Sequence, residues 1–558
     1  MNPESLDSKT LKLDFNERSD QVSVIAQESE YSDLWRYPQR EQLEQQIADI
    51  YSLKPEQVFC SNGGDEAIML LMRLIKETTK VILPLPAFSQ YTWGVDSWQL
   101  DAILVSANSD LTINTSNTIQ AIKQNPGAIT IITRPNNPTG ESIALETLLD
   151  IIENASVNQG IVFLDEAYIE FSDEEAVTIK LLSQFDNLVI LRTLSKAYGL
   201  AGIRLGYILG SEILIEQFKT RSIPFNIPAP SIEIAKTALS QDNRQEVENY
   251  SEVIRKNRKK LLCWLNDKKI PVVESQANFV LLKLNNLQAS AVKSFLAKNN
   301  LLIKTFPEGN SSIKQLGKCI RITIPYTLDR LLSLLEQALT PKLICLDMDG
   351  VLIDTSESYD QAVKATVEEL SGQKISMEQI FSLRDQGGFN NDWVLSRALL
   401  ETLNINVSLE KVTEVFQQFY LGDNNNGLVA NEKPLIQKEL IQTINKSQKT
   451  QFAVVTGRPR IEAQAGLSLI GLQTEALISL DDVTLPKPSP EGIKKLQCQF
   501  SNASWMCGDN PDDMQAAVAS NSLAVGIGKR NVEALYQAGA DIVLESINQL
   551  EDWLKPVK

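Results

Sequence analysis

The sequence predicts an α/β fold in which helices cover mainly parallel sheets. The first observation is a series of short, continuous apolar runs, which are typical of strands buried on both faces. Segments of helical periodicity alternate with these runs. The second observation is the length of 558 residues, which exceeds what one hydrophobic core usually supports, so we expect two or three domains. The runs are residues 128–135, 160–168, 188–195, 342–350, 451–459 and 504–511.

A proline marks the predicted boundary between two domains. Residues 328–339, LDRLLSLLEQAL, have the periodicity of a helix, which Pro341 should end. We therefore expect one domain over residues 1–340 and another over 342–558. Between residues 356 and 450 amphipathic segments replace the strand-like runs, which predicts a helical cap inserted into the second α/β domain.

Composition excludes several function classes. The net charge of −17 and the pI near 4.8 argue against a nucleic-acid or acidic-membrane partner, because phosphate backbones are bound by basic surfaces. The chain has no histidine, which excludes Ser-His-Asp triads, Cys-His pairs and imidazole metal sites. Any catalysis would therefore depend on lysine, carboxylates, a cofactor or a hard metal ion.

The cysteines and the N-terminal segment indicate a cytoplasmic protein. The 6 cysteines are scattered without a CxxC pair, which disfavours structural zinc and a disulfide framework and fits reduced thiols. The first residues, MNPESLDSKTLKLDFNE, are polar and acidic, unlike a signal peptide. No apolar run approaches the ~20 residues that a membrane helix needs.

Residues suited to cofactor chemistry follow the predicted strands and turns of the first domain. The segment SNGGDEAI places Gly64 and Asp65 at a strand-to-helix turn, where backbone N–H groups and the helix dipole can bind a phosphate. Phe88, in LPAF, offers a ring that can stack on a flat cofactor. Lys196 follows the run 188–195. The remaining candidates are Asn137 in RPNNPTG, Asp165 and Tyr168 in FLDEAY, Ser195 in TLSK, and Arg204.

This set of residue types suits pyridoxal phosphate (PLP). A lysine such as Lys196 can form the Schiff base that holds PLP, and a buried carboxylate such as Asp165 keeps the ring nitrogen protonated. Once the amino substrate has displaced Lys196, its amine can carry the proton of the substrate carbon. Asn137 and Tyr168 would donate to the ring oxygen. Backbone amides, Ser195 and Arg204 would bind the phosphate.

Residues 12–340 resemble fold-type I, class II aminotransferases, most closely those of the histidinol-phosphate type. The resemblance implies transamination between a phosphorylated amino compound and 2-oxoglutarate or glutamate. It also implies a homodimer, in which Tyr37 reaches the cofactor phosphate of the neighbouring subunit, and it assigns the anionic end of the substrate to Arg321. The motifs that carry it are, in order, RYP (36–38), NGGDEAI, PNNPTG, DEAYIEF, LRTLSKAYGLAGIRLGY and CIRIT (319–323).

Lys304 departs from the pattern of this family, which usually has a second arginine shortly before the CIRIT-like motif. A lysine still pairs with a substrate phosphate as a point charge, but it lacks the two-pronged geometry of arginine. Two alternatives therefore stay open: an aminotransferase for another phosphorylated amino compound, and a phosphothreonine decarboxylase of the same fold.

The second domain carries a series of acidic residues with one threonine and one lysine between them. Asp347 and Asp349 follow an apolar run in LDMDGVLIDT. Asp509 and Asp513, in CGDNPDDM, have the spacing that would place them on one face of a helical turn. Carboxylate oxygens are the ligands that Mg²⁺ prefers, so these four aspartates are the predicted metal ligands. Thr456 in VVTGR and Lys487 in LPKPSP are the predicted phosphate-binding residues.

The charges of this series suit the hydrolysis of a phosphate ester. Asp347 would attack the phosphorus, while Asp349 would protonate the leaving alcohol and then activate water. Mg²⁺ and Lys487 would neutralise the transferred group, and Thr456 would hold its oxygens. The order of the motifs over residues 342–558 resembles the haloacid dehalogenase superfamily, in particular its phosphatases with an α-helical cap.

The two resemblances together imply consecutive reactions. In histidine biosynthesis, imidazole-acetol phosphate is transaminated to histidinol phosphate, which is then dephosphorylated. We therefore expect a bifunctional enzyme of that pathway, with small-molecule substrates, PLP and Mg²⁺. A phosphatase of unrelated specificity joined to the aminotransferase stays open as the alternative.

Overall fold

The computed structural model describes residues 11–14, 16, 37–173, 177–306, 316–389, 391–422 and 426–554. Its contacts divide the chain into two units, the first with residues up to 289 and 299–329, the second with residues 290–298 and from 330 onward. Helix α10 (Asp329–Leu339) falls largely in the second unit, because Trp505 there donates to the carbonyl oxygen of Gln337 at 2.6 Å. The helix ends before Pro341, as its sequence predicts.

A seven-stranded sheet forms the centre of the first unit, in the order β2-β8-β7-β6-β5-β3-β4. All neighbouring strands are parallel except at β8, which runs antiparallel to β2 and β7. The predicted runs 128–135, 160–168 and 188–195 are the central parallel strands β5, β6 and β7. The strands are β2 (Val58–Asn62), β3 (Val81–Pro84), β4 (Ala102–Val105), β5 (Ile129–Thr133), β6 (Ile161–Asp165), β7 (Leu188–Thr193) and β8 (Leu205–Gly210).

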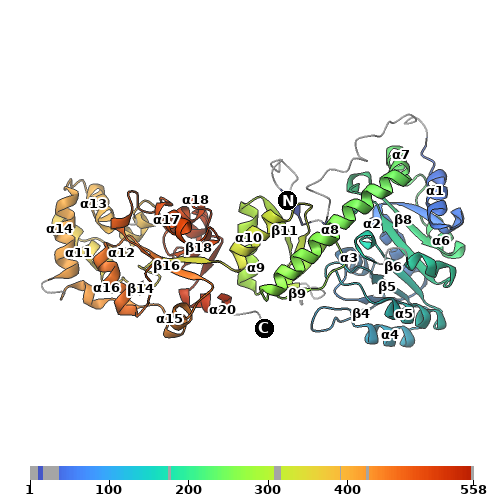
Figure 1. Ribbon diagram of the computed structural model, residues 1–558, viewed down its shortest axis with the longest axis horizontal. Coiled ribbons are helices and arrows are strands. Elements are labelled where there is room, and N and C mark those ends of the chain that lie inside the picture. The colour runs from blue at the N-terminus through green and yellow to red at the C-terminus, as the bar shows by residue number, and fades with distance from the viewer. Residues whose placement is uncertain are drawn as a thin grey trace. The chain divides into compact units, whose positions relative to one another are not determined.

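Helices cover this sheet and supply its core. The buried face of α2, with Ile68 and Leu71, packs with Phe163 and Leu191 of the sheet. Figure 1 shows α2, α3, α5 and α6 around β5, β6 and β8, and α8 as a long helix beside them. The helices are α1 (Glu41–Tyr51), α2 (Gly63–Thr78), α3 (Ser89–Ser97), α4 (Thr115–Gln124), α5 (Leu145–Val157), α6 (Glu212–Lys219), α7 (Ala229–Ala238) and α8 (Gln241–Asp267).

A smaller, mostly antiparallel sheet has the order β1-β11-β12-β10-β9. Its strand β12 carries Arg321, and the register places Lys304 of β11 directly opposite it. The strands are β1 (Leu11–Leu13), β9 (Val272–Val273), β10 (Phe279–Lys283), β11 (Leu301–Thr305) and β12 (Cys319–Thr323). Helix α9 (Asn286–Lys298), between β10 and β11 in the chain, falls largely in the second unit.

The second unit is built on a six-stranded sheet that is parallel throughout, in the order β17-β16-β13-β18-β19-β20. The runs predicted at 342–350, 451–459 and 504–511 are its central strands. These strands are β13 (Leu343–Leu346), β16 (Gln451–Val455), β17 (Leu477–Ile478), β18 (Ser504–Gly508), β19 (Leu523–Ile527) and β20 (Ile542–Leu544). The helices are α15 (Lys438–Asn445), α16 (Arg460–Ile470), α17 (Glu491–Gln499), α18 (Pro511–Ala519), α19 (Val532–Gln537) and α20 (Leu550–Leu554).

Four helices form a cap with its own hydrophobic core, which includes Val363, Leu395 and Phe416. Figure 1 shows α11, α13 and α14 grouped to one side of β16 and β18. The chain enters the cap through β14 and returns through β15, and these two strands pair antiparallel. The elements are β14 (Ile353–Asp354), α11 (Tyr359–Ser371), α12 (Met377–Arg384), α13 (Asp392–Thr402), α14 (Leu409–Leu421) and β15 (Lys433–Pro434).

In the part of the chain that is described, no helix combines the length and the apolar character needed to cross a bilayer.

Candidate active sites

A cavity of about 370 Å³ lies at the carboxyl end of β5, β6 and β7. Loops that follow parallel strands meet at this edge of a sheet, so it is the usual place for a ligand in an α/β fold. Its lining includes ten of the residues predicted from the sequence. These are Gly64, Asp65, Phe88, Asn137, Asp165, Tyr168, Ser195, Lys196, Arg204 and Arg321.

Asp165 is the buried carboxylate of this cavity, at 4% exposure. The Tyr91 hydroxyl donates to its Oδ2 atom at 2.7 Å, and the backbone N–H of Ala167 donates to Oδ1 at 3.0 Å. Burial raises the pKa of Asp165 to about 6, against the opposing effect of these hydrogen bonds. Such a carboxylate is suited to a cationic partner in the cavity, as the protonated ring nitrogen of PLP would be.

A chain of polar contacts also lines the cavity. Arg321 Nη1 donates to Asn137 Oδ1 at 2.5 Å, and Asn137 Nδ2 donates to the Tyr168 hydroxyl at 3.2 Å. Asn16 Nδ2 donates to the same hydroxyl at 3.0 Å. Arg321 is buried, which lowers its pKa, and its Nε atom has no hydrogen-bond partner among the described residues. A buried guanidinium with an unused donor is suited to an anionic group of a substrate.

The N-terminus of α2 forms the end of the cavity that would hold a phosphate. Gly63 begins the helix with a φ of +72°, and a Cβ there would lie 2.6 Å from Arg204 Nη2, so glycine is required. Arg204 forms an ion pair with Asp65 at 2.6 Å. Ser195 accepts a hydrogen bond from the Thr193 hydroxyl at 2.9 Å. Backbone N–H groups, Ser195 and Arg204 together suit the phosphate of PLP.

Lys196 follows β7 and is half-buried in the cavity, with its Nζ atom 5.8 Å from the centre of the Tyr168 ring.

Two predicted residues do not line the cavity. Tyr37 is 76% exposed and stacks on Phe225 with ring centres 4.5 Å apart. Lys304 is exposed although its backbone lies opposite Arg321.

The second unit brings three carboxylates together beyond the ends of β13 and β18. Oxygen atoms of Asp347, Asp509 and Asp513 lie within 4.8 Å of one another. Lys487 Nζ contacts Asp347 at 2.8 Å and Asp513 at 2.5 Å. Burial and the charge of Asp513 raise the pKa of Asp347 to about 7. When all three carboxylates are ionised, they leave a double negative charge against the one ammonium, which fits a divalent cation with oxygen ligands such as Mg²⁺.

The expectation that Asp509 and Asp513 share a helical turn is wrong, although both belong to the cluster. Asn510 caps α18 and Pro511 is its first residue, so Asp509 precedes the helix and only Asp513 lies within it. The cap is reciprocal, since Asp513 Oδ2 accepts from the backbone N–H of Asn510 at 3.1 Å. Proline favours this first position because its missing N–H is unpaired there in any case.

Asp349 and Thr456 lie beside this cluster in different environments. The Asp349 carboxylate contacts the Arg458 guanidinium at 2.6 Å and is not one of the three carboxylates of the cluster. Thr456 is buried at the end of β16, where its hydroxyl accepts from the backbone N–H of Arg458 at 3.1 Å. The assignment of Asp349 as a metal ligand stays a prediction.

The two sites define a PLP-dependent transferase of fold type I joined to a haloacid dehalogenase-like hydrolase. Residues 9–335 match the family Aminotransferase class I and II, and residues 344–527 match the family Haloacid dehalogenase-like hydrolase. The chain therefore belongs to the class I and II aminotransferases, a family that uses PLP, and carries a second enzymatic domain.

Relatives and solved structures agree on the first unit. A histidinol-phosphate aminotransferase of Caldanaerobacter subterraneus is 35% identical over 289 residues, which are 51% of this chain and 78% of the relative. One of Haemophilus influenzae is 32% identical over 301 residues, 52% of this chain and 78% of the relative. The fold matches the histidinol-phosphate aminotransferase of Clostridium acetobutylicum with a TM-score of 0.51 and 22% identity, covering 59% of this chain and 98% of that one.

A second structural match contains the cofactor. The histidinol-phosphate aminotransferase of Sinorhizobium meliloti in complex with pyridoxal-5'-phosphate matches with a TM-score of 0.50 and 22% identity, covering 58% of this chain and 88% of that one. At this identity the match concerns the fold.

Three residues of the sites, Asn16, Tyr91 and Arg458, were not predicted from the sequence. Asn16 and Tyr91 contact Tyr168 and Asp165 across long sequence separations, and neither lies next to a motif or a strand end. Arg458 lies two residues after Thr456 in the quoted motif VVTGR. Its closeness to a predicted phosphate-binding threonine was the feature of the sequence that could have identified Arg458 as a site residue.

Proposed function

We propose that this chain is a bifunctional enzyme of histidine biosynthesis. Its first unit would interconvert imidazole-acetol phosphate and histidinol phosphate, with glutamate and 2-oxoglutarate as the amino-group pair, and its second unit would hydrolyse the phosphate ester with Mg²⁺. The observation that carries the proposal is the single cavity that holds Lys196, Asp165 and Arg321 together. The histidinol-phosphate aminotransferases among its relatives support the choice of substrate.

The residues of the first cavity have distinct roles in the transamination. PLP, when bound, supplies an electron sink for the pair of electrons left when the substrate carbon loses its proton. Asp165 would keep the ring nitrogen protonated. Lys196 Nζ would take the proton from the substrate carbon and deliver it to a carbon of the cofactor. Asn137 and Tyr168 orient the ring by donating hydrogen bonds to its oxygen.

The anionic ends of the ligands are bound at two separate places. The N-terminus of α2, with Ser195 and Arg204, would hold the cofactor phosphate. Arg321, whose Nε donor has no partner in the described part of the chain, would bind the phosphate of histidinol phosphate or a carboxylate of glutamate. Lys304 would approach the substrate phosphate as a second, more distant cation, because it lies opposite Arg321 in the sheet.

The second unit has the groups that ester hydrolysis needs. Asp347 attacks the phosphorus, and Lys487, which already contacts it, offsets the charge of the transferred group. Thr456 holds a phosphoryl oxygen. Asp349 gives a proton to the leaving oxygen and later takes one from water. Mg²⁺, held by Asp347, Asp509 and Asp513, would supply charge neutralisation in this site.

A homodimer of the first unit is part of the proposal. The side chains of Tyr37, Ile223 and Phe225 are exposed at 76%, 67% and 56% and lie near a groove of about 560 Å³ that is lined by residues 38–41 and 222–227. Exposed apolar groups gathered on one face are typical of subunit interfaces. A second copy on this face would cover Tyr37 and bring it toward the cofactor phosphate of its neighbour. We place this dimer in the cytoplasm.

A spectrum of the PLP-loaded chain tests the proposed substrate. L-histidinol phosphate, added without keto acid and without Mg²⁺, should bleach the yellow band of bound PLP, and 2-oxoglutarate should restore it. Release of CO₂ from phosphothreonine, with no response to 2-oxoglutarate, would favour the decarboxylase alternative. A response to other phosphorylated amines alone would contradict the assignment to histidine biosynthesis.

A further inference from the structure

The ester hydrolysis described above assigns no role to Arg458. Its guanidinium nevertheless contacts Asp349, which acts as acid and base in that reaction. The side chain is buried, at 2% exposure. Its Nε atom donates to Asp349 Oδ1 at 2.8 Å, and Nη2 lies 2.6 Å from the same oxygen. On its other edge, Nη1 and Nη2 donate to the two oxygens of Glu432 at 3.1 and 2.9 Å. One cation therefore bridges two carboxylates.

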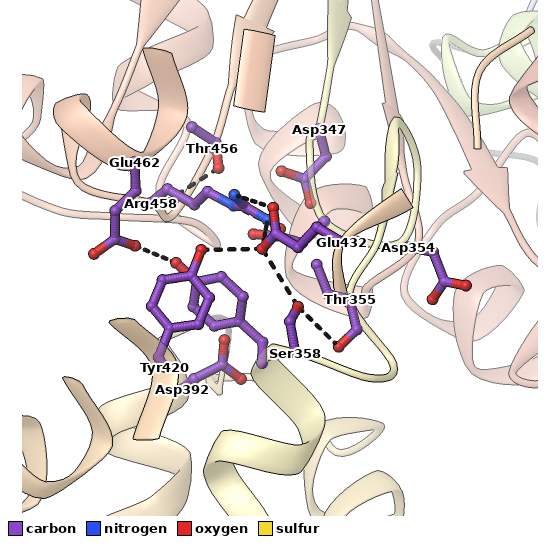
Figure 2. Close-up of polar contacts among 12 residues, drawn as sticks. Asp347, Asp354, Thr355, Ser358, Asp392, Tyr420, Glu432, Thr456, Arg458 and Glu462 are labelled. Atoms are coloured by element: carbon purple, nitrogen blue, oxygen red, sulfur yellow. Dashed lines mark hydrogen bonds and ion pairs between the residues drawn. The ribbon is translucent and has the colours of Figure 1, made fainter. Parts of the chain in front are cut away.

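Glu432 lies where the chain passes between cap and core. It follows the short helix η8 (Leu428–Asn431) and precedes β15, which pairs with β14 on the way into the cap. Its Oε1 atom accepts hydrogen bonds from the Tyr420 hydroxyl of α14 at 3.0 Å and from the Ser358 hydroxyl at 3.3 Å. Figure 2 shows Glu432 between Arg458 and these two hydroxyls. The chain enters the cap through residues 353–358 and leaves it through residues 428–434, and we call these two segments the cap hinge. The Glu432 carboxylate links them, because it belongs to one segment and accepts a hydrogen bond from Ser358 of the other.

The position of Asp349 depends on this arginine for electrostatic reasons. Asp349 follows Asp347 by two residues beyond the end of β13, beside the carboxylate cluster. Arg458 is the cation that contacts the Asp349 carboxylate, and its planar guanidinium fixes direction as well as distance. Without it, repulsion from the neighbouring carboxylates would favour other positions of the Asp349 side chain.

We propose that Arg458 is a positioning residue that fixes the Asp349 carboxylate beside the phosphoryl group and, through Glu432, couples that position to the cap hinge. The proposal rests on the phosphatase function proposed above. Both Arg458 contacts use Oδ1 of Asp349, and the described residues form no hydrogen bond to Oδ2. The second oxygen is thereby left for the substrate oxygen and for water.

Two proton transfers depend on that oxygen. In the first half of the reaction, an Asp347 oxygen bonds to phosphorus, the bond from phosphorus to the substrate oxygen breaks, and Asp349 gives its proton to that oxygen. In the second half, a water oxygen bonds to phosphorus, its proton passes to Asp349, and the bond from phosphorus to Asp347 breaks to release phosphate. An alkoxide leaving group has to be protonated as it departs, whereas a nitrophenolate departs without being protonated.

The difference between leaving groups gives a sharp test with the full-length, PLP-loaded chain and Mg²⁺. In the Arg458→Met variant, kcat for L-histidinol phosphate should fall about 100-fold with little change in KM, because the acid is misplaced. With p-nitrophenyl phosphate, the first turnover should stay fast and release one p-nitrophenolate per active site as a burst before slow turnover. A proportionate loss for both esters without a burst, or a rise in KM alone, would overturn the proposal.

Variants of the hinge test the second half of the proposal. Glu432→Gln removes the charge that anchors Arg458 and should give the same burst with a smaller, roughly 10-fold loss of kcat. Arg460→Met is the matched control, since Arg460 pairs with Asp482 and its side chain is 42% exposed. This control should behave as the wild type. Wild-type kinetics in Glu432→Gln would overturn the link to the hinge.

A double variant guards against a simple loss of folding. Arg458→Met alone leaves the buried Glu432 without its cation, whereas Arg458→Met with Glu432→Gln removes both charges. A folded double variant that shows the burst supports the positioning role, and one without it overturns that role. A wild-type chain that hydrolyses neither ester would instead overturn the proposed phosphatase function, and this proposal with it.

Discussion

Tyr91 donates a hydrogen bond of 2.7 Å to Asp165, the buried carboxylate at the end of β6. Tyr91 belongs to α3 and is itself fully buried, so this contact fixes the carboxylate from outside the segment that carries it. The hydrogen bond lowers the pKa of Asp165, while burial raises it. The charge available to the cofactor ring therefore depends on a residue outside the predicted motifs.

Replacing Tyr91 by phenylalanine should weaken catalysis while preserving the fold. Loss of the hydrogen bond makes the Asp165 carboxylate less stable as an anion, so it holds the ring nitrogen proton less well. We expect the rate of the half-reaction with L-histidinol phosphate to fall about 10-fold, the equivalent of roughly one hydrogen bond. Stopped-flow decay of the yellow band measures this rate. An unchanged rate in a folded, PLP-saturated variant would show that Tyr91 has no such role.

The raised pKa of Asp165 also predicts how the stability of the PLP-free chain depends on pH. Burial raises the pKa to about 6 in the folded state, compared with about 3.9 in an unfolded chain. The folded state binds the proton more tightly, so its stability falls as pH rises through this window, and the destabilisation is complete above about pH 7. Asp165→Asn cannot ionise and avoids that loss.

The stability difference between Asp165→Asn and the wild type should therefore shift in favour of the variant by about 1.4 kcal/mol from pH 5 to pH 8. Urea unfolding of the PLP-free proteins at the two pH values measures it through the first transition. A shift in the opposite direction would show that Asp165 is better stabilised as an anion than its burial indicates.

The two activities should be separable by single substitutions. Lys196→Ala should reduce transamination by more than about 1,000-fold and leave phosphatase activity unchanged, because the two sites share no residue. Asp347→Asn should do the reverse, and removal of Mg²⁺ should match it. Parallel assays of keto-acid formation and phosphate release measure both effects. Loss of both activities in either folded variant would contradict the assignment of one reaction to each unit.

Gly350 provides a test of how tightly the carboxylate cluster is packed. Its φ is +70°, and a Cβ would collide with the Asp509 carboxylate. Gly372 is a matched control with a φ of +67° and no atom within 4 Å of the added Cβ. Alanine at either position should cost about 1 kcal/mol of stability from the backbone.

Only Gly350→Ala should also abolish phosphatase activity and weaken Mg²⁺ binding, because it displaces Asp509. Thermal unfolding and metal titration of both variants separate the two effects. Phosphatase activity lost equally in Gly372→Ala would point to backbone strain instead of displacement of Asp509.

Strands and cavity residues could be predicted because they depend on local patterns. The continuous apolar runs gave β5, β6, β7, β13, β16 and β18, and residues just after a run, such as Asp165, lie at the strand ends. Parallel strands then bring these ends together without further information. The same reasoning does not reveal that β8 runs antiparallel, since a buried strand has the same composition in either direction.

Contacts between distant segments could not be predicted in this way. Asn16 reaches Tyr168 across the two sheets of the first unit, and Glu432 reaches Arg458 from the cap hinge. Neither contact follows from periodicity, because each depends on how whole elements pack. The misplacement of Asp509 on a helix had a local cause, the capping role of Asn510 and Pro511.

The central claim is that one chain performs two consecutive reactions on one phosphorylated amino compound. It is tested most directly by supplying imidazole-acetol phosphate, glutamate and Mg²⁺ to the PLP-loaded protein and following three products together. We predict that histidinol phosphate rises and then falls, and that 2-oxoglutarate, histidinol and phosphate are present in equal amounts once it has been consumed. Phosphate without 2-oxoglutarate, or histidinol phosphate that accumulates without histidinol, would contradict the claim.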